Sequence, residues 1–142
     1  MRLSTAARAG EQLVPGACRK QYFALAVDRG TMFACLAGCA YLGSYPTPED
    51  AEQERTRLAR LLAFGDGKLH TASHGITKRL YAAYPDLGRN IKAFPALLKT
   101  GPLRVSAEER KTMSLFGYLT KMFDDSKKTV DECVAILERA GL

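Results

Sequence analysis

Residues 31–43 read TMFACLAGCAYLG, and none of them is charged. A helix that is apolar on every side is normally buried on all faces. The stretch is too short to cross a bilayer, which takes about 20 apolar residues. Ala34 and Gly38 would lie one helical turn apart and leave room for neighbouring backbones. We therefore predict a helix from Thr31, its N-cap, to Gly43, at the centre of a helical core.

The chain around this stretch has the length and composition of one globular domain. It has 142 residues, of which 46% are hydrophobic and 25% charged, enough for a single core spanning residues 1–142. The opening MRLSTAARAG lacks the apolar core of a secretion signal. We expect a cytoplasmic protein, in the host cytoplasm if phage-encoded, or one packaged into a virion, with no membrane contact.

Capping residues, prolines and glycines divide the rest of the chain into helices. The predicted helices are Thr5–Leu13 capped by Ser4, 48–64 capped by Thr47, Ile76–Tyr84, short pieces at 91–94 and 96–99, 107–123 after a capping box at Ser106, and 130–140 after one at Thr129. Residues 19–27 fit a strand or a helix, 28–30 a turn, and 66–75 a loop. The predicted fold class is all-α, a compact bundle of five to seven helices around the buried Cys/Ala/Gly helix.

Charge in the 47–64 helix follows its direction. Acids come first and arginines later, the order that suits the helix dipole. We interpret these charges as a solvated face. The residues expected to point inward are Ala51, Leu58, Leu61 and Leu62.

The net charge of +6 is concentrated in the middle of the chain. The window from residue 68 to 104 holds seven basic residues and one acid, Asp86, and the remainder has 14 of each sign. Such a block favours an anionic partner, nucleic acid or an acidic protein, although a merely soluble surface is the competing interpretation. The candidate binding residues are Lys68, Lys78, Arg79, Arg89, Lys92, Lys99 and Arg104.

Two arrangements of cysteine and histidine suggest chemistry. Cys35 and Cys39, four apart, could join His70 and His74 in a zinc site, but both cysteines fall in the most apolar segment. Cys18, beside two basic residues, could be a nucleophile, but no family signature surrounds it. We favour buried, reduced thiols, Cys133 included, and assign no catalytic residue, metal or cofactor.

Nucleic-acid binding is the stronger hypothesis. The last two predicted helices have the outline of a helix-turn-helix, yet the final one carries mostly acids, Asp131, Glu132 and Glu138. This argues against base readout. We expect a nonspecific, salt-sensitive contact through the basic window.

A protein-interaction role is the alternative. Tyr45, Tyr84 and Phe94 lie among loop-forming residues, where they could anchor a partner or close the protein's own core. The protein would then be a structural component of a phage particle or other assembly, or a homo-oligomer.

Three motifs resemble a group of small bacterial and phage proteins that have no established activity. They are LSxAxRxGxxLxP at residues 3–15, CxxGxAYxG at 35–43 and DxxxxTxDE at 124–132. Some members of this group carry a CxxC motif and two later histidines. This chain has no CxxC motif, and Lys121 and Ser126 stand where those histidines would fall. The resemblance implies a phage or bacterial accessory context and no particular chemistry.

Overall fold

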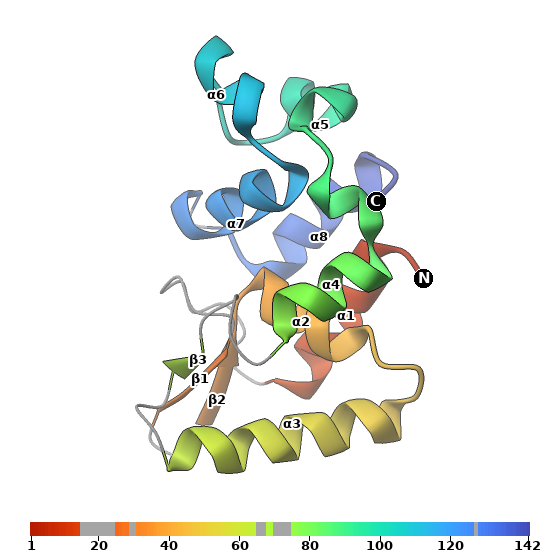
Figure 1. Ribbon diagram of the computed structural model, residues 1–142, viewed down its shortest axis with the longest axis vertical. Helices are drawn as coiled ribbons and strands as arrows, with labels where there is room; N and C mark the ends of the chain where they lie inside the picture. Colours follow the sequence, from red (N-terminus) through yellow and green to blue (C-terminus); the bar gives the residue numbers. More distant parts are fainter. Residues whose placement is uncertain (15–24, 29–30, 65–67, 70–74, 127) are drawn as a thin grey trace.

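The computed structural model places a small sheet beside a larger set of helices (Figure 1). The structure describes residues 1–14, 25–28, 31–64, 68–69, 75–126 and 128–142. Its elements are α1 (Leu3–Leu13), β1 (Leu25–Asp28), β2 (Thr31–Ala34), α2 (Leu36–Gly43), α3 (Pro48–Ala63), β3 (Lys68–Leu69), α4 (Ile76–Ala83), η1 (Pro85–Gly88), η2 (Ile91–Ala93), α5 (Pro95–Thr100), α6 (Ala107–Thr112), α7 (Leu115–Asp125) and α8 (Val130–Arg139). The fold is mostly helical, but the all-α prediction missed the sheet, and the described helices outnumber the five to seven expected.

The central stretch is half strand and half helix, which corrects the prediction of one helix. Residues 31–34 form β2, which pairs antiparallel with β1 in the register Thr31↔Asp28 and Phe33↔Ala26. Cys35, in extended backbone, is the N-cap of α2. Threonine and phenylalanine suit a strand, and an apolar run alone does not separate strand from helix. The expected burial is confirmed for residues 34–43, which are all buried, whereas Thr31 is exposed and Phe33 is partly exposed.

The sheet has the strand order β2-β1-β3. The uncertain segment 19–27 is therefore strand over its last three residues, and the rest of it lies outside the described residues. The predicted loop at 66–75 contains β3, which pairs with β1 at Leu69↔Leu25. Residues 29–30, 66–67 and 70–74 of the predicted turn and loop lie outside the description.

Helices α1 and α2 pack backbone against backbone at two glycines. A Cβ built on Gly10 would lie 1.8 Å from the carbonyl oxygen of Cys39, and one built on Gly43 would lie 1.7 Å from that of Ala6. Only glycine allows such an approach, because any side chain would occupy the same space. The close helix packing expected of α2 is therefore present, but it depends on these two glycines.

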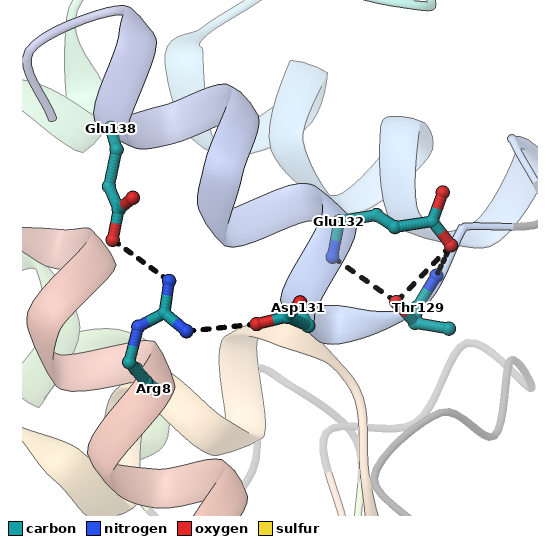
Figure 2. Close-up of polar contacts among 5 residues, drawn as sticks. All are labelled: Arg8, Thr129, Asp131, Glu132 and Glu138. Atoms are coloured by element: carbon teal, nitrogen blue, oxygen red, sulfur yellow. Dashed lines mark hydrogen bonds and ion pairs between the residues drawn. The ribbon is translucent and has the colours of Figure 1, made fainter.

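The other end of α1 is fixed to the end of α8. The predicted cap Ser4 lies inside α1, whose N-cap is Arg2, and is only 2% exposed. Its hydroxyl donates to the carbonyl oxygen of Leu142 at 3.1 Å. One turn later, Arg8 forms ion pairs with Asp131 at 2.8 Å and Glu138 at 2.9 Å, as Figure 2 shows. Ser4 was a wrong cap because tertiary packing buries its hydroxyl.

The other three predicted caps are confirmed. Thr47 accepts the amide of Asp50 at 3.1 Å, and Ser106 and Thr129 each form a full capping box, the latter drawn in Figure 2. The predicted helix 107–123, however, breaks at Met113. Ser114 starts α7 by accepting the amide of Gly117 at 3.0 Å.

The break follows from a pairing across the fold. The amide of Ile91 donates to the Met113 carbonyl at 2.9 Å, and the amide of Leu115 donates to the Arg89 carbonyl at 2.8 Å. This bridge requires extended backbone at 113–114, so a continuous helix is impossible there. It also ties residues 89–91, in the middle of the basic window, to the start of α7.

One buried hydrophobic cluster joins α1, α2 and β1 to α4, α5, α7 and α8. Tyr118, Phe123 and Leu25 are among its largest fully buried side chains. Within the described residues, no helix has the length and apolar content needed to cross a membrane.

Candidate functional site

The seven predicted binding residues follow the chain upward from the sheet to the end of the molecule opposite α3 (Figure 1). Lys68 lies in β3, and its side chain is outside the description. Lys78 and Arg79 belong to α4, Arg89 and Lys92 to the η1–η2 segment, Lys99 to α5, and Arg104 to the connection before α6. The structure therefore places the window along several elements.

Arg79 is engaged by the fold. Its side chain is half-buried, its Nε donates to the hydroxyl of Ser44 at 2.9 Å, and its guanidinium lies 3.7 Å from the ring centroid of Tyr45. The Tyr45 hydroxyl in turn donates to Glu54 at 2.9 Å. Arg79 thus joins α4 to the loop between α2 and α3. Its guanidinium charge interacts there with the ring of Tyr45.

The remaining basic residues of the window include a run without acids. Between Asp86 and Glu108 the chain has four basic residues and no acidic one. We call residues 87–107 the basic segment. Its four basic side chains are all exposed: Arg89, Lys92, Lys99 and Arg104.

Buried leucine and isoleucine side chains hold the basic segment against the core. Leu87 is 2% exposed, and Ile91 and Leu97 are fully buried. In helices this short, neighbouring residues point in different directions, so an inward Ile91 turns Lys92 toward solvent. Gly101 lets the turn after α5 approach Tyr118, because a Cβ there would lie 1.9 Å from the tyrosine hydroxyl oxygen. The outward lysines are thus consequences of the packing.

Three of these four cations make no ion pair within the described residues: Lys92, Lys99 and Arg104. Arg89 pairs with Asp86 at 3.3 Å, and both side chains are more than half exposed. An exposed pair of this kind contributes little to stability and is readily exchanged for another anion. The segment therefore carries positive charge that the fold does not neutralise.

Helix α6 borders the basic segment with balanced charge. Lys111 pairs with Glu108 at 2.9 Å, and Glu109 pairs with Lys121 of α7 at 3.2 Å. The backbone hydrogen bond at Ser106 is the main cause that lowers the pKa of Glu109, and the contacts with Lys121 and the Ser106 side chain lower it further. The positive field of this end of the molecule therefore comes mainly from residues 87–107.

The described cysteines are buried and form no disulfide with one another. Cys35, Cys39 and Cys133 are at most 6% exposed. Burial raises the pKa of Cys35 to about 11 and raises that of Cys39 well above its ordinary value. A hollow of about 270 Å³ lies beside Cys35, between α2 and α7. A thiol with so high a pKa is a poor nucleophile at neutral pH.

The zinc hypothesis draws on residues that the structure does not cover in full. His70 and His74 lie outside the described residues, as does the candidate nucleophile Cys18. Within the described part of the chain, no group of three or more histidine, cysteine, aspartate or glutamate side chains could hold a metal ion.

The aromatic residues considered as partner anchors pack on the core. Tyr45, Tyr84 and Phe94 are half-buried against it. Burial raises the pKa of Tyr84, and the pKa of Tyr45 is raised by burial and by its hydroxyl contacts. Their placement matches the interpretation in which they close the protein's own core.

The final helix, α8, packs on the core of the protein. Five of its ten residues are buried, and two of its acids hold Arg8 of α1. A reading helix would instead present basic or amide side chains outward.

Sequence reasoning missed an exposed apolar feature at the end of α3. Phe64 is 92% exposed and Leu61, expected inside, is 39% exposed.

Comparison of the chain with protein-family models, with characterised proteins and with solved structures gives no match. The argument for function therefore depends on the geometry of the described residues.

Proposed function

We propose that the protein is a non-enzymatic binding protein that contacts nucleic acid through the basic segment, residues 87–107. The observation that carries the proposal is the run of four exposed cations without an acid. The resemblance to bacterial and phage proteins adds an accessory role as the expected context, in the cytoplasm or in a virion.

The arrangement favours phosphate contacts over base contacts. Lysine and arginine on short helices and turns can each neutralise a phosphate, which supplies affinity without reading sequence. The last two helices do not form a reading unit, since α8 is acidic and packed on α1. We therefore expect binding that is nonspecific and weakens steeply with salt.

The magnitude follows from the number of contacts. Four neutralised phosphates give a slope of about −3 to −4 in a plot of log association constant against log salt concentration on duplex DNA. Between about 50 and 200 mM salt this corresponds to roughly a 100-fold loss of affinity.

Fluorescence anisotropy with a labelled DNA duplex, titrated at several salt concentrations, tests the proposal. The variant Lys92→Gln/Lys99→Gln/Arg104→Gln should lose most binding, and its salt slope should fall by about 3. The matched control Lys121→Gln/Lys128→Gln/Arg139→Gln removes the same charge from outside the segment and should retain that slope. Circular dichroism checks that both variants are folded.

Equal losses in the two triple variants would show that total charge, and not the basic segment, governs binding. Absence of DNA binding by the native protein would refute the nucleic-acid partner. The same titration with labelled polyglutamate then examines the acidic-protein alternative, using the same two variants.

A further inference from the structure

The outward side of α3 is a polar helix face on which none of the described residues packs. α3 lies across one end of the molecule and buries Ala51, Leu58 and Leu62 (Figure 1). At about 100° per residue, the opposite side of the helix presents Glu49, Gln53, Thr56 and Arg60, followed by Phe64. These side chains are exposed except Thr56, which is partly exposed, and Phe64 is 92% exposed.

The charged side chains near the two ends of this face are those of Glu49 and Arg60. Glu49 and Arg60 take part in no ion pair among the described residues. Neighbouring charged side chains of α3 do form ion pairs. Glu52 pairs with Arg55, and Arg57 pairs with Glu54. The face therefore has a free negative charge near the start of the helix and a free positive charge near its end.

The order of residues on the face is self-complementary. When two copies of α3 run antiparallel about a two-fold axis between residues 54 and 55, Glu49 of each copy faces Arg60 of the other. Gln53 faces Thr56 beside the axis, where the two polar side chains can hydrogen-bond. Phe64 comes opposite the loop at 45–46, which offers an exposed proline.

We infer that α3 is the contact surface for a second copy of this chain, paired antiparallel about that axis. A two-fold contact requires that one patch complement itself, and this face meets the requirement in charge at both ends. A shallow groove of about 410 Å³ on the same face accommodates the facing side chains; it is lined by Glu52, Gln53, Thr56, Arg57 and Arg60.

The length of α3 sets the strength of the contact. Its 16 residues span about 24 Å at roughly 1.5 Å per residue. One helix pair of this length falls below the roughly 1,200 Å² of total buried area typical of stable interfaces, so the dimer is a weak one. Its exposed ion pairs make it weaker as salt rises. A dissociation constant of tens to hundreds of micromolar is about what such an interface supports.

Charge reversal combined with mixing tests the inference by sedimentation velocity over a concentration series. Glu49→Arg alone places Arg against Arg60 at both ends, and Arg60→Glu alone places Glu against Glu49. Each should raise the dissociation constant about tenfold or more. An equimolar mixture of the two variants restores both attractive contacts and should form a heterodimer.

Matched controls carry the same charge changes on other elements. Glu108→Arg on α6 and Lys99→Glu on α5 are exposed, and each should dimerise like the native chain. Native protein that stays monomeric at about 1 mM, where such an interface would be largely occupied, overturns the inference. So does a dimer that survives both single reversals, or a mixture of the two that remains monomeric.

The test is independent of nucleic-acid binding. In the absence of nucleic acid, the triple variant of the basic segment should dimerise like the native chain, and Glu49→Arg should bind a DNA duplex too short to reach two segments with a native salt slope. Failure of one proposal is therefore separable from failure of the other.

Discussion

Replacing Gly10 with alanine tests the contact between α1 and α2 most directly. The added Cβ would lie 1.8 Å from the carbonyl oxygen of Cys39 and 2.8 Å from its Cα. Non-bonded carbon contacts are normally at about 3.5 Å, so the two backbones must separate locally by more than about 1 Å. The obstacle is the backbone of a fully buried helix, which has no flexible side chain to move aside.

The expected cost combines two opposing terms. Overpacking a well-packed core typically costs about 1–3 kcal/mol, and a backbone obstacle puts this site at the upper end. Alanine is better than glycine inside a helix by about 1 kcal/mol. We therefore expect the free energy of unfolding to fall by about 2 kcal/mol.

Gly117→Ala in α7 is the matched control. Its Cβ would meet the Ser114 hydroxyl oxygen at 3.4 Å and the Met113 side chain at 3.8 Å, which are ordinary contacts. The same substitution should therefore stabilise the protein here, by up to about 1 kcal/mol. The two variants differ in sign because only one glycine faces a backbone.

Urea unfolding followed by circular dichroism measures both variants. With a slope of about 2 kcal/mol/M, the midpoint should fall by roughly 1 M for Gly10→Ala and rise for Gly117→Ala. A Gly10→Ala protein as stable as the native one would refute the close packing of α1 on α2, and with it the burial of Cys39.

Three further predictions concern the buried thiols and the partly buried Tyr45. In a Cys18→Ser background, the remaining thiols should resist a thiol reagent at neutral pH until urea unfolds the chain; rapid labelling of the native protein would contradict their burial. The pKa of Cys35 rises from 9.0 to about 11, so between these pH values the unfolded chain loses a proton that the folded chain keeps. Stability should therefore fall as pH rises through this range, by about 1.4 kcal/mol per pH unit from this group, measured by urea unfolding at each pH. Tyr45→Phe removes the hydrogen bond to Glu54 and should lower the free energy of unfolding by about 1–2 kcal/mol. The Tyr81 hydroxyl has no hydrogen-bond partner among the described residues, so the control Tyr81→Phe should leave stability nearly unchanged in the same assay.

Local signals in the sequence were sufficient where a helix start depends on its own residues. Thr47 followed by Pro48, and the capping boxes at Ser106 and Thr129, gave correct helix starts because each hydrogen bond joins residues three apart. The burial of residues 35–43 was also predictable, because an uncharged run that is apolar on every side is normally buried.

Several of the incorrect predictions involve pairing or packing with another segment of the chain. Residues 31–34 are a strand because β1 pairs with them, and the helix breaks at Met113 because residues 89–91 pair with 113–115. Ser4 is buried because the end of α8 covers it. The partners of Ser4 and of residues 113–115 lie outside any local window, so tertiary contacts override the local preference there. β1 is close to β2 in the sequence, but an apolar run alone does not separate strand from helix.

Charge was predictable in amount but not in availability. The sequence shows Arg79 and Lys92 as equivalent cations, yet the ring of Tyr45 and the hydroxyl of Ser44 engage only the first. On α3, the order of acids and arginines indicated a dipole-stabilised helix, and only the structure shows which of those charges lack partners. Position in the fold decides which charges remain available to another molecule.

The two proposed surfaces lie at opposite ends of the long axis of the molecule, with α3 at one end and α5 near the other (Figure 1). Pairing through α3 would therefore cover neither basic segment and would direct the two segments apart. A nucleic acid long enough to meet both would bind the second segment intramolecularly, which raises avidity without any new contact. A weak α3 interface is sufficient for this purpose, because a polymer that holds two copies close together raises their local concentration. Assembly and binding would then reinforce each other although no residue belongs to both surfaces.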